Sequence, residues 1–336
     1  MGVYHLMGLG LSPGVVTGPI SYLAKLYNNW EVEGKEFFAR SGEEKQREKG
    51  DQVGGIQLLI LFTTKEVING EVDCKPYIKN PYGKIGGNPE KRTDTMKKIL
   101  EPLLIQEWSK IKSSQNNTGI IYWCEVELSD IKTTYERIAK VVASLAKGGG
   151  KQGKEIWMNL TGGNNVINSA LQMVASLSHE VSRLYYVQSA NEKAEKCVYF
   201  TSEKREEYWV ELPVIPLVLS DLNNAVLEIP NLELGISSKE VYGRLKGHER
   251  YSILIEGIDF EQFRDTTLRS MNKLGLITVR KEYETGNGIC TLGPQWELIL
   301  KYESIMNEAK AGEEVLTIEK LEQQKTWINR QEIRLN

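Results

Sequence analysis

Two glycine-containing turns carry the residues of this chain with the clearest chemical potential. Residues 9–14 read Leu-Gly-Leu-Ser-Pro-Gly, and residues 159–165 read Asn-Leu-Thr-Gly-Gly-Asn-Asn. Glycine lets a backbone approach a ligand closely and supplies positive φ angles where a turn needs them. The side chains beside these glycines are hydroxyls and amides, which are neutral hydrogen-bonding groups. The pattern favours binding of an anion by backbone N–H groups at the start of a helix.

Each turn lies between a predicted strand and a predicted helix. The apolar runs 3–10 and 156–160 predict buried strands, and a helical pattern follows each turn. Asn164 or Asn165 is expected to cap the second helix, whose free N–H groups then point over the strand end. In an open parallel sheet this place is a ligand crevice. The alternative is an ordinary turn whose glycines serve geometry alone.

Strands and helices alternate through the first 212 residues. Further strands are predicted at 56–62, 119–126 and 184–187, and helices at 95–112 and 130–145. Segments 197–201 and 208–212 predict an added antiparallel hairpin. The alternation predicts an α/β fold with a doubly wound, mostly parallel, Rossmann-like sheet over residues 1–212. Residues 69–93 predict a long loop, and a long loop beside a binding edge is often functional.

The alternation of predicted strands and helices ends after residue 212. Prolines mark a predicted linker at 213–235, and three helical stretches and two short strands at 236–299 predict a winged helix-turn-helix. Residues 300–336 predict C-terminal helices, the last at 313–328. Five basic residues lie on or near the expected recognition helix and wing and are candidate DNA contacts: Arg264, Arg269, Lys273, Arg280 and Lys281. Residues 236–299 hold nine Lys/Arg and nine Asp/Glu, so a dimerisation and packing module is the alternative.

Composition excludes several classes of protein. No apolar run approaches the roughly 20 residues of a membrane span, and no basic leader precedes the first strand. The four cysteines lack any CxxC spacing, so we expect no zinc site and a reduced, cytoplasmic protein. The net charge of −3 argues against broad, non-specific binding of nucleic acid. No cofactor and no metal are expected.

The two turns together resemble the CRISPR-associated Rossmann-fold (CARF) domain. The resemblance rests on residues 9–16 after the first strand and on 159–163 after the fourth, and it covers roughly 1–212. It implies that both turns meet at the carboxyl edge of the sheet. It also implies a symmetric homodimer that binds a cyclic oligoadenylate, the second messenger of type III CRISPR antiviral defence. The predicted winged helix fits family members with that output domain.

The Ser-Pro-Gly form of the first turn most resembles the ring nucleases, which cleave this messenger without a metal. In them a serine of the first turn and a lysine after the second glycine pair align and stabilise attack of a ribose 2′-OH on phosphorus. Ser12 matches the serine, but Asn164 and Asn165 stand where the lysine would. Cleavage is then slow, or another cation such as Lys151 or Lys154 enters, or the protein only senses the ligand. A helix cap is the alternative role of Ser12.

These observations define one candidate site and two hypotheses. The expected ligand-binding residues are Gly10, Leu11, Ser12, Pro13, Gly14, Thr63, Thr64, Asn159, Thr161, Gly162, Gly163, Asn164 and Asn165, with Ser12 as the catalytic candidate. The first hypothesis is a homodimer that binds cyclic tetra-adenylate and acts as a metal-independent ring nuclease. The second is a non-enzymatic, cyclic-oligoadenylate-responsive transcription regulator that binds DNA through the winged helix. A HEPN ribonuclease is excluded because only three residues separate Arg244 from His248.

Overall fold

The computed structural model describes residues 3–38, 55–79, 94–111, 118–148, 155–178, 180–189, 191–201, 208–214, 219–281, 288–311 and 316–335. The chain divides into two compact units. The first unit comprises Met1–Pro216 and Ile305–Asn336, and the second comprises Leu217–Ser304.

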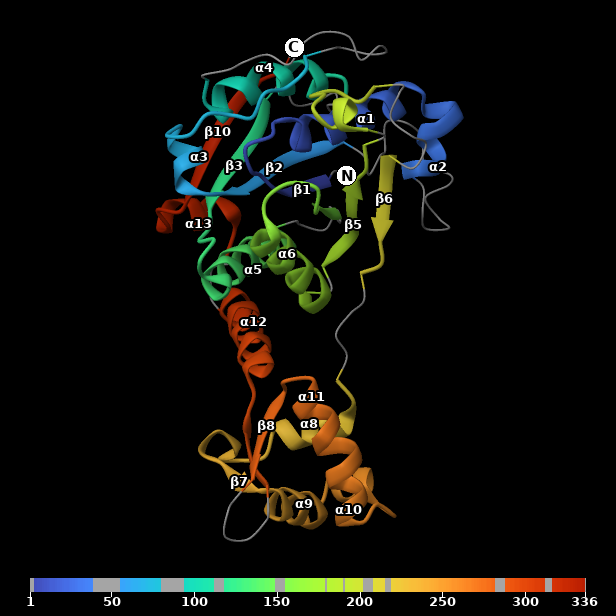
Figure 1. Ribbon diagram of the computed structural model, residues 1–336, viewed down its shortest axis with the longest axis vertical. Helices are drawn as coiled ribbons and strands as arrows, with labels where there is room; N and C mark the ends of the chain where they lie inside the picture. The colour runs from blue at the N-terminus through green and yellow to red at the C-terminus, as the bar shows by residue number, and fades with distance from the viewer. Residues whose placement is uncertain are drawn as a thin grey trace. The chain divides into compact units, whose positions relative to one another are not determined.

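A seven-stranded sheet in the order β10-β3-β2-β1-β4-β5-β6 forms the centre of the first unit (Figure 1). Five neighbouring strands are parallel: β1 (Val3–Gly8), β2 (Ile56–Thr63), β3 (Thr118–Glu125), β4 (Glu155–Asn159) and β5 (Val181–Val187). The predicted α/β class and mostly parallel sheet are confirmed. The strand order reverses between β1 and β4, so the two strands that precede the glycine turns are neighbours at the reversal point.

Helices cover both faces of this sheet. Figure 1 shows the helices α1 (Gly14–Asn28) and α4 (Met96–Trp108) on one face and α5 (Ile131–Gly148) and α6 (Asn165–Ser178) on the other. Strand β2 is apolar at nearly every position because helices bury both of its faces. Shorter helices complete the unit: η1 (Trp30–Gly34), α2 (Lys35–Phe38), α3 (Lys65–Asn69), α7 (Glu192–Glu195) and α13 (Ile318–Gln324).

The predicted hairpin of residues 197–201 with 208–212 is wrong. Strand β6 (Trp209–Leu212) pairs antiparallel with β5 instead, because the outer edge of β5 is open to it. Residues 197–201 form no strand, and α1 side chains satisfy their backbone. Thr17 Oγ1 donates to the carbonyl of Val198, and the N–H of Phe200 donates to Ser21 Oγ at 2.6 Å. Their apolar character reflects burial beneath α1 rather than a sheet.

The prediction of helices to the end of the chain is wrong after residue 324. Helix α12 (Pro294–Ala311) agrees with the sequence pattern and crosses the division between the units, and α13 is short. Strand β10 (Ile328–Arg334) then pairs antiparallel with β3 over its whole length. The open edge of β3 supplies the hydrogen bonds, and burial of Ile328 and Ile333 supplies the apolar contact.

The second unit is helical with a small sheet. Its elements are α8 (Asp221–Leu227), η5 (Leu232–Leu234), β7 (Ile236–Ser237), α9 (Ser238–Gly247), η6 (Ser252–Ile255), α10 (Phe260–Phe263), η7 (Arg264–Leu268), α11 (Arg269–Lys273), β8 (Ile277–Lys281) and β9 (Gly288–Leu292). The three strands are antiparallel in the order β7-β9-β8. The stretch 213–235, predicted as a linker, contains α8, whose Val226 and Leu227 are buried, so this stretch contributes to the core of the unit.

All four cysteines lie in described residues, are buried and form no disulfide. Burial raises the pKa of the Cys290 thiol to about 11, so this thiol is unreactive near neutral pH. None of the helices in the described ranges combines the length and apolar character needed to cross a bilayer.

Candidate ligand site at the sheet's carboxyl edge

The two glycine turns are in backbone contact at the carboxyl edge of the sheet. Strands β1 and β4 pair in parallel with Met7 opposite Asn159, so the turns leave the sheet side by side. A Cβ built on Gly162 would lie 2.0 Å from the carbonyl oxygen of Gly8, and one on Gly8 would lie 2.8 Å from that of Gly162. Only glycine fits at either position. The meeting of the turns that the sequence predicts is therefore present, at the point where open α/β sheets bind ligands.

The individual glycines have different roles. Gly163 has a φ of +78°, the left-handed conformation that the sequence led us to expect in this turn. Gly10 is less constrained, because a Cβ there would meet only the Gly163 carbonyl, at 4.0 Å. Gly8, whose carbonyl oxygen makes the closest approach, was not among the predicted site residues. Its signal was present in the Gly-x-Gly spacing of residues 8–10.

Asn159 and Thr161 hold the second turn in place. The buried Asn159 side chain donates from Nδ2 to the carbonyl of Val15, at 3.0 Å, and accepts at Oδ1 from the N–H of Thr161, at 2.8 Å. Thr161 Oγ1 in turn accepts from the N–H of Val187 at 2.7 Å. One asparagine thus connects the second turn to the first turn of α1. These contacts give both residues a positioning role within the site.

The start of α6 is capped as the sequence predicts. Asn164 Oδ1 accepts from the N–H of Ile167 at 3.0 Å, and Asn165 is the first residue of the helix. Asn164 is half-buried and Asn165 is exposed. The cap leaves the Asn164 side-chain N–H groups and the first N–H groups of α6 as neutral donors at the edge of the sheet.

Ser12 does not cap a helix, so the alternative role that the sequence offered for it is wrong. Pro13 occupies the N-cap position of α1 and provides no side-chain acceptor. Ser12 is half-buried, and its hydroxyl has no hydrogen-bond partner among the described residues. The half-buried Ser12 hydroxyl is therefore available to a ligand.

The threonines at the end of β2 differ in accessibility. Thr63 is fully buried, and its Oγ1 has no hydrogen-bond partner in the described part of the chain. Thr64 is half-buried, and its side chain hydrogen-bonds Glu66, which lowers the pKa of that carboxyl. Only Thr64 therefore lies at the surface of the edge.

The predicted site residues as a set lie at the carboxyl ends of β1, β2 and β4. Those that are half-buried or exposed are Gly10, Leu11, Ser12, Gly14, Thr64, Thr161, Gly163, Asn164 and Asn165. Those that are buried are Pro13, Thr63, Asn159 and Gly162. Lys151 and Lys154, proposed as substitute cations, lie outside the described residues.

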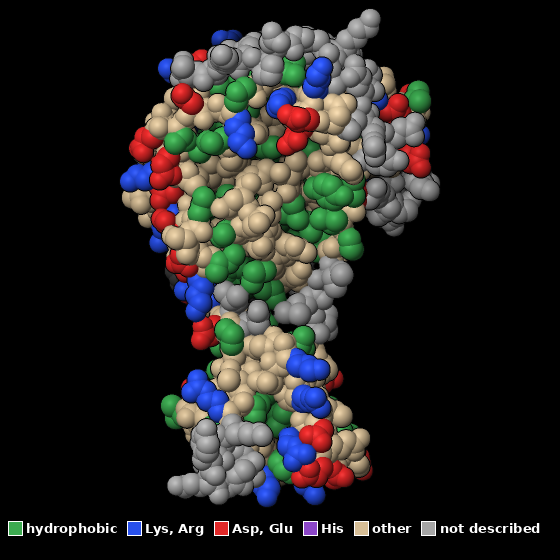
Figure 2. All heavy atoms as spheres, viewed as in Figure 1, with side chains coloured by type: hydrophobic (Ala, Val, Ile, Leu, Met, Phe, Trp, Pro, Cys, Tyr) green, Lys and Arg blue, Asp and Glu red, His purple; other side chains and the backbone are tan. Residues whose placement is uncertain are grey.

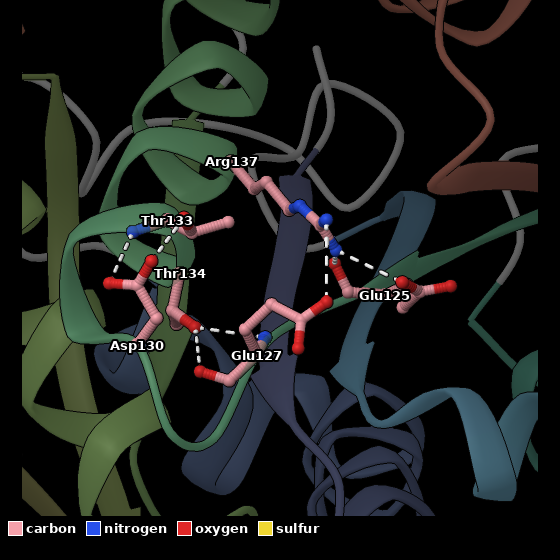
Figure 3. Close-up of polar contacts among 6 residues, drawn as sticks. All are labelled: Glu125, Glu127, Asp130, Thr133, Thr134 and Arg137. Atoms are coloured by element: carbon pink, nitrogen blue, oxygen red, sulfur yellow. Dashed lines mark hydrogen bonds and ion pairs between the residues drawn. The ribbon is translucent and has the colours of Figure 1, made fainter.

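An acidic cluster that was not among the predicted site residues lies at the end of β3, at the same edge. Figure 3 shows Arg137 between Glu125 and Glu127, at N···O distances of 3.3 and 3.7 Å. The guanidinium also donates to the Glu125 carbonyl at 2.7 Å. Asp130 accepts hydrogen bonds from Thr133, which lower its pKa. The cluster has three carboxylates and one guanidinium, so its net charge is negative and it repels an anionic ligand. Such a ligand is therefore expected to bind at the ends of β1 and β4 and not at the end of β3.

Histidine chemistry is absent from this edge as far as the structure describes it. His5 lies inside β1, fully buried, with Nε2 2.6 Å from the hydroxyl of Tyr185. Burial lowers the pKa of His5 to about 3, so the imidazole is neutral near pH 7. In the described ranges no three His, Cys, Asp or Glu side chains group together as metal ligands.

The candidate DNA contacts lie in the second unit and differ in charge compensation. Arg264 pairs with Glu261 at 2.5 Å and with Asp265 at 2.8 Å. Arg269 and Lys273 on α11 are exposed, as is Arg280 on β8. The side chain of Lys281 lies outside the described residues. Figure 2 shows acidic side chains close to basic ones on the lower part of this unit.

Comparison with known proteins gives the following distant similarities. No family model matches the chain. An uncharacterized protein of Archaeoglobus fulgidus is 26% identical over 242 residues, which cover 67% of this chain and 73% of the relative. Enterococcus italicus Csm6, solved bound to cyclic hexa-2′-fluoro-hexa-dAMP, superposes with a TM-score of 0.36 at 10% identity over 81% of this chain. A Vibrio cholerae protein superposes with a TM-score of 0.27 at 9% identity over 91% of this chain. The chain spans 59% and 65% of these two structures, less than two thirds of each, and the likeness is too weak to carry an argument.

Proposed function

We propose that this protein binds a cyclic oligoadenylate at the paired turns, as a homodimer, in type III CRISPR antiviral signalling. The observation that carries the proposal is the backbone contact between Gly8 and Gly162, which holds both turns of the CARF-like pattern together at the reversal of the strand order. The preferred ring is cyclic tetra-adenylate. A two-fold dimer offers the same surface to both halves of such a ring.

The chemistry of the edge supports a nucleotide ligand. The N-termini of α1 and α6 provide backbone N–H groups for phosphates, and this does not require a broad basic surface. Figure 2 shows no continuous basic surface on the face of the first unit that it presents. Ser12, Asn164 and Asn165 provide donors and acceptors for adenine edges and ribose hydroxyls.

Ring cleavage is the enzymatic part of the proposal, with Ser12 as the catalytic residue. The ribose 2′-oxygen bonds to the adjacent phosphorus while the bond from phosphorus to the 5′-oxygen breaks. The 2′-OH loses its proton and the 5′-oxygen gains one, leaving a 2′,3′-cyclic phosphate and a 5′-OH with no water consumed. The Ser12 hydroxyl, which has no partner in the described residues, aligns this attack. With the neutral donors of the two turns alone, the developing charge is stabilised weakly and the reaction is slow.

The test is incubation of the full chain with labelled cyclic tetra-adenylate in EDTA, with binding measured by calorimetry. Binding by a dimer, together with linear products that disappear in Ser12→Ala, supports the whole proposal. Binding without products in the wild type supports sensing and removes the enzymatic part. Absence of binding refutes the proposal.

A second candidate is a cyclic-oligoadenylate-responsive transcription regulator without enzymatic activity. It is favoured by the exposed basic residues Arg269, Lys273 and Arg280, if the second unit acts as a winged helix-turn-helix. The ion pairs of Arg264 with its acidic neighbours count against a strong DNA interface. Ligand-dependent retardation of promoter DNA, lost in the Arg269→Ala, Lys273→Ala double variant, would favour this candidate over the ring nuclease.

A further inference from the structure

A ligand made of phosphodiesters needs a cation that the two turns do not contain. Residues 9–14 and 159–165 include no lysine and no arginine. Backbone N–H groups alone offer partial charges, whereas a charge-assisted contact to phosphate is about twice as strong as a neutral one. The inference concerns a cation for the same ligand at the paired turns, and it therefore rests on the proposed function.

The segment that follows α3 crosses the first turn and places a lysine there. The N–H of Lys75 donates to the carbonyl of Leu11 at 2.8 Å, so the backbone of residue 75 lies against the residue next to Ser12. Three residues further on, the N–H of Ile78 donates to the carbonyl of Lys196, and the Ile78 carbonyl accepts from Val198. Residues 71–79 therefore form a strap across the turn, anchored at both of these places.

Buried neighbours fix the position of Lys75 within this strap. Cys74 and Tyr77 are 5% and 3% exposed, and Cys74 Sγ lies 3.7 Å from Met96 Sδ. Lys75 itself is exposed and forms no ion pair with any residue in the described part of the chain. A lysine that is held by its backbone and carries a flexible ammonium is suited to a phosphate that approaches from solvent.

Three other cations near this edge, Arg137, Lys196 and Lys65, lie beside acidic residues. Arg137 lies between Glu125 and Glu127 (Figure 3), and Lys196 Nζ lies 2.6 Å from Glu192. Lys65 follows Thr64 and lies next to Glu66. The pKa of Glu66 is lowered by the hydrogen bond with Thr64 and, to a smaller extent, by the charge of Lys65. Lys75 is the cation whose backbone contacts the Ser12 turn and whose charge no described carboxylate compensates.

We propose that Lys75 binds a phosphate of the cyclic nucleotide beside Ser12 and supplies the positive charge that the second turn lacks. In the cleavage reaction the same ammonium stabilises the charge that develops on the attacked phosphate. A lysine after the glycine pair is then not needed, which is consistent with Asn164 at that position. The cation arrives from a different segment of the sequence, which explains why no motif reveals it.

The test measures the affinity of cyclic tetra-adenylate for wild type, Lys75→Ala and Lys75→Arg at several salt concentrations. Loss of one charge-assisted contact predicts a decrease of roughly 10-fold or more in Lys75→Ala. The affinity should also depend less on salt. The negative slope of log affinity against log salt concentration should become shallower by about 0.7 for each phosphate that loses its lysine. Lys75→Arg retains most of the affinity. Thermal unfolding should not change, because the side chain is exposed.

Two lysines serve as matched controls. Lys35 is an exposed lysine of α2, which follows the end of α1 away from the turns, and Lys35→Ala should bind as the wild type does. Lys65→Ala removes the lysine that follows the end of β2. If the wild type binds and Lys75→Ala binds equally well, or if Lys65→Ala carries the loss instead, the assignment to Lys75 is refuted while the proposed function stands. If the wild type does not bind, the proposed function itself is refuted.

Discussion

The contact between Gly8 and Gly162 predicts that a single methyl group at position 162 disrupts the site. In Gly162→Ala the new Cβ would lie 2.0 Å from the Gly8 carbonyl oxygen and 2.7 Å from a methyl carbon of Val15. Both contacts are far inside normal packing distance, and one of the two atoms belongs to the backbone of β1. The ends of β1 and β4 must therefore separate by roughly 1 Å, which is the kind of backbone shift that costs about 1–3 kcal/mol.

The expected result is a loss of both stability and binding in Gly162→Ala. A cost of about 1–3 kcal/mol lowers the Tm by about 2–4 °C per kcal/mol in a unit of this size. Calorimetry with cyclic tetra-adenylate then reports the affinity of the protein that remains folded. We expect binding to be lost, because the start of α6 and the Ser12 turn no longer face one ligand in a fixed geometry.

Gly10→Ala is the matched control for this substitution. It adds the same methyl group in the adjoining turn, where the nearest atom would be the Gly163 carbonyl oxygen at 4.0 Å. Its stability should stay within about 0.5 kcal/mol of the wild type. Equal Tm values and equal affinities for Gly162→Ala and the wild type would refute the reasoning, because the strand ends could then separate freely.

Three further outcomes follow from buried contacts of the first unit. Asn159→Asp should lower the free energy of unfolding by about 1–3 kcal/mol in urea at pH 7, since a carboxylate cannot donate to the Val15 carbonyl. His5 has a pKa of about 3 in the folded protein, below its ordinary 6.5, so the unfolded chain binds more protons between these values. His5 therefore does not affect the free energy of unfolding above pH 6.5, and lowers it by up to about 1.4 kcal/mol per pH unit as the pH falls below 6.5. In acid titrations of unfolding, His5→Phe should show a weaker pH dependence. Ile333→Ala in β10 should cost about 2–5 kcal/mol by thermal unfolding, and no change would mean that β10 does not pair with β3.

The local sequence was sufficient to predict the five parallel strands of the sheet and the turns that follow β1 and β4. Strands such as β2 are nearly continuous apolar runs because both faces are covered, and this signal does not depend on distant residues. The cap at Asn164 and the positive φ at Gly163 also follow from side-chain and backbone preferences within a few positions. These features could therefore be predicted from residue types and spacing alone.

The elements that the sequence did not predict depend on partners far along the chain. Residues 328–334 have only two buried isoleucines, and their strand forms because the edge of β3, some 200 positions earlier, is open. The buried stretch 197–200 has the apolar character of a strand but is held by hydroxyls of α1. The Ser12 cap failed for a local reason, because Pro13 occupies the N-cap position. Long-range pairing of this kind has no local pattern that distinguishes it from other apolar segments.

The residues of the two motifs separate into two groups with different physical roles. Gly162 and Asn159 are buried and hold the turns together, so changes there should alter stability and binding at once. Ser12 and Asn165 are accessible, as is Lys75 on the strap, so changes there should alter affinity or rate at nearly constant stability. A motif contains both groups in one stretch and cannot distinguish them. Comparing the ratio of stability loss to affinity loss across these variants therefore separates a ligand site from a pair of turns that serve only the fold.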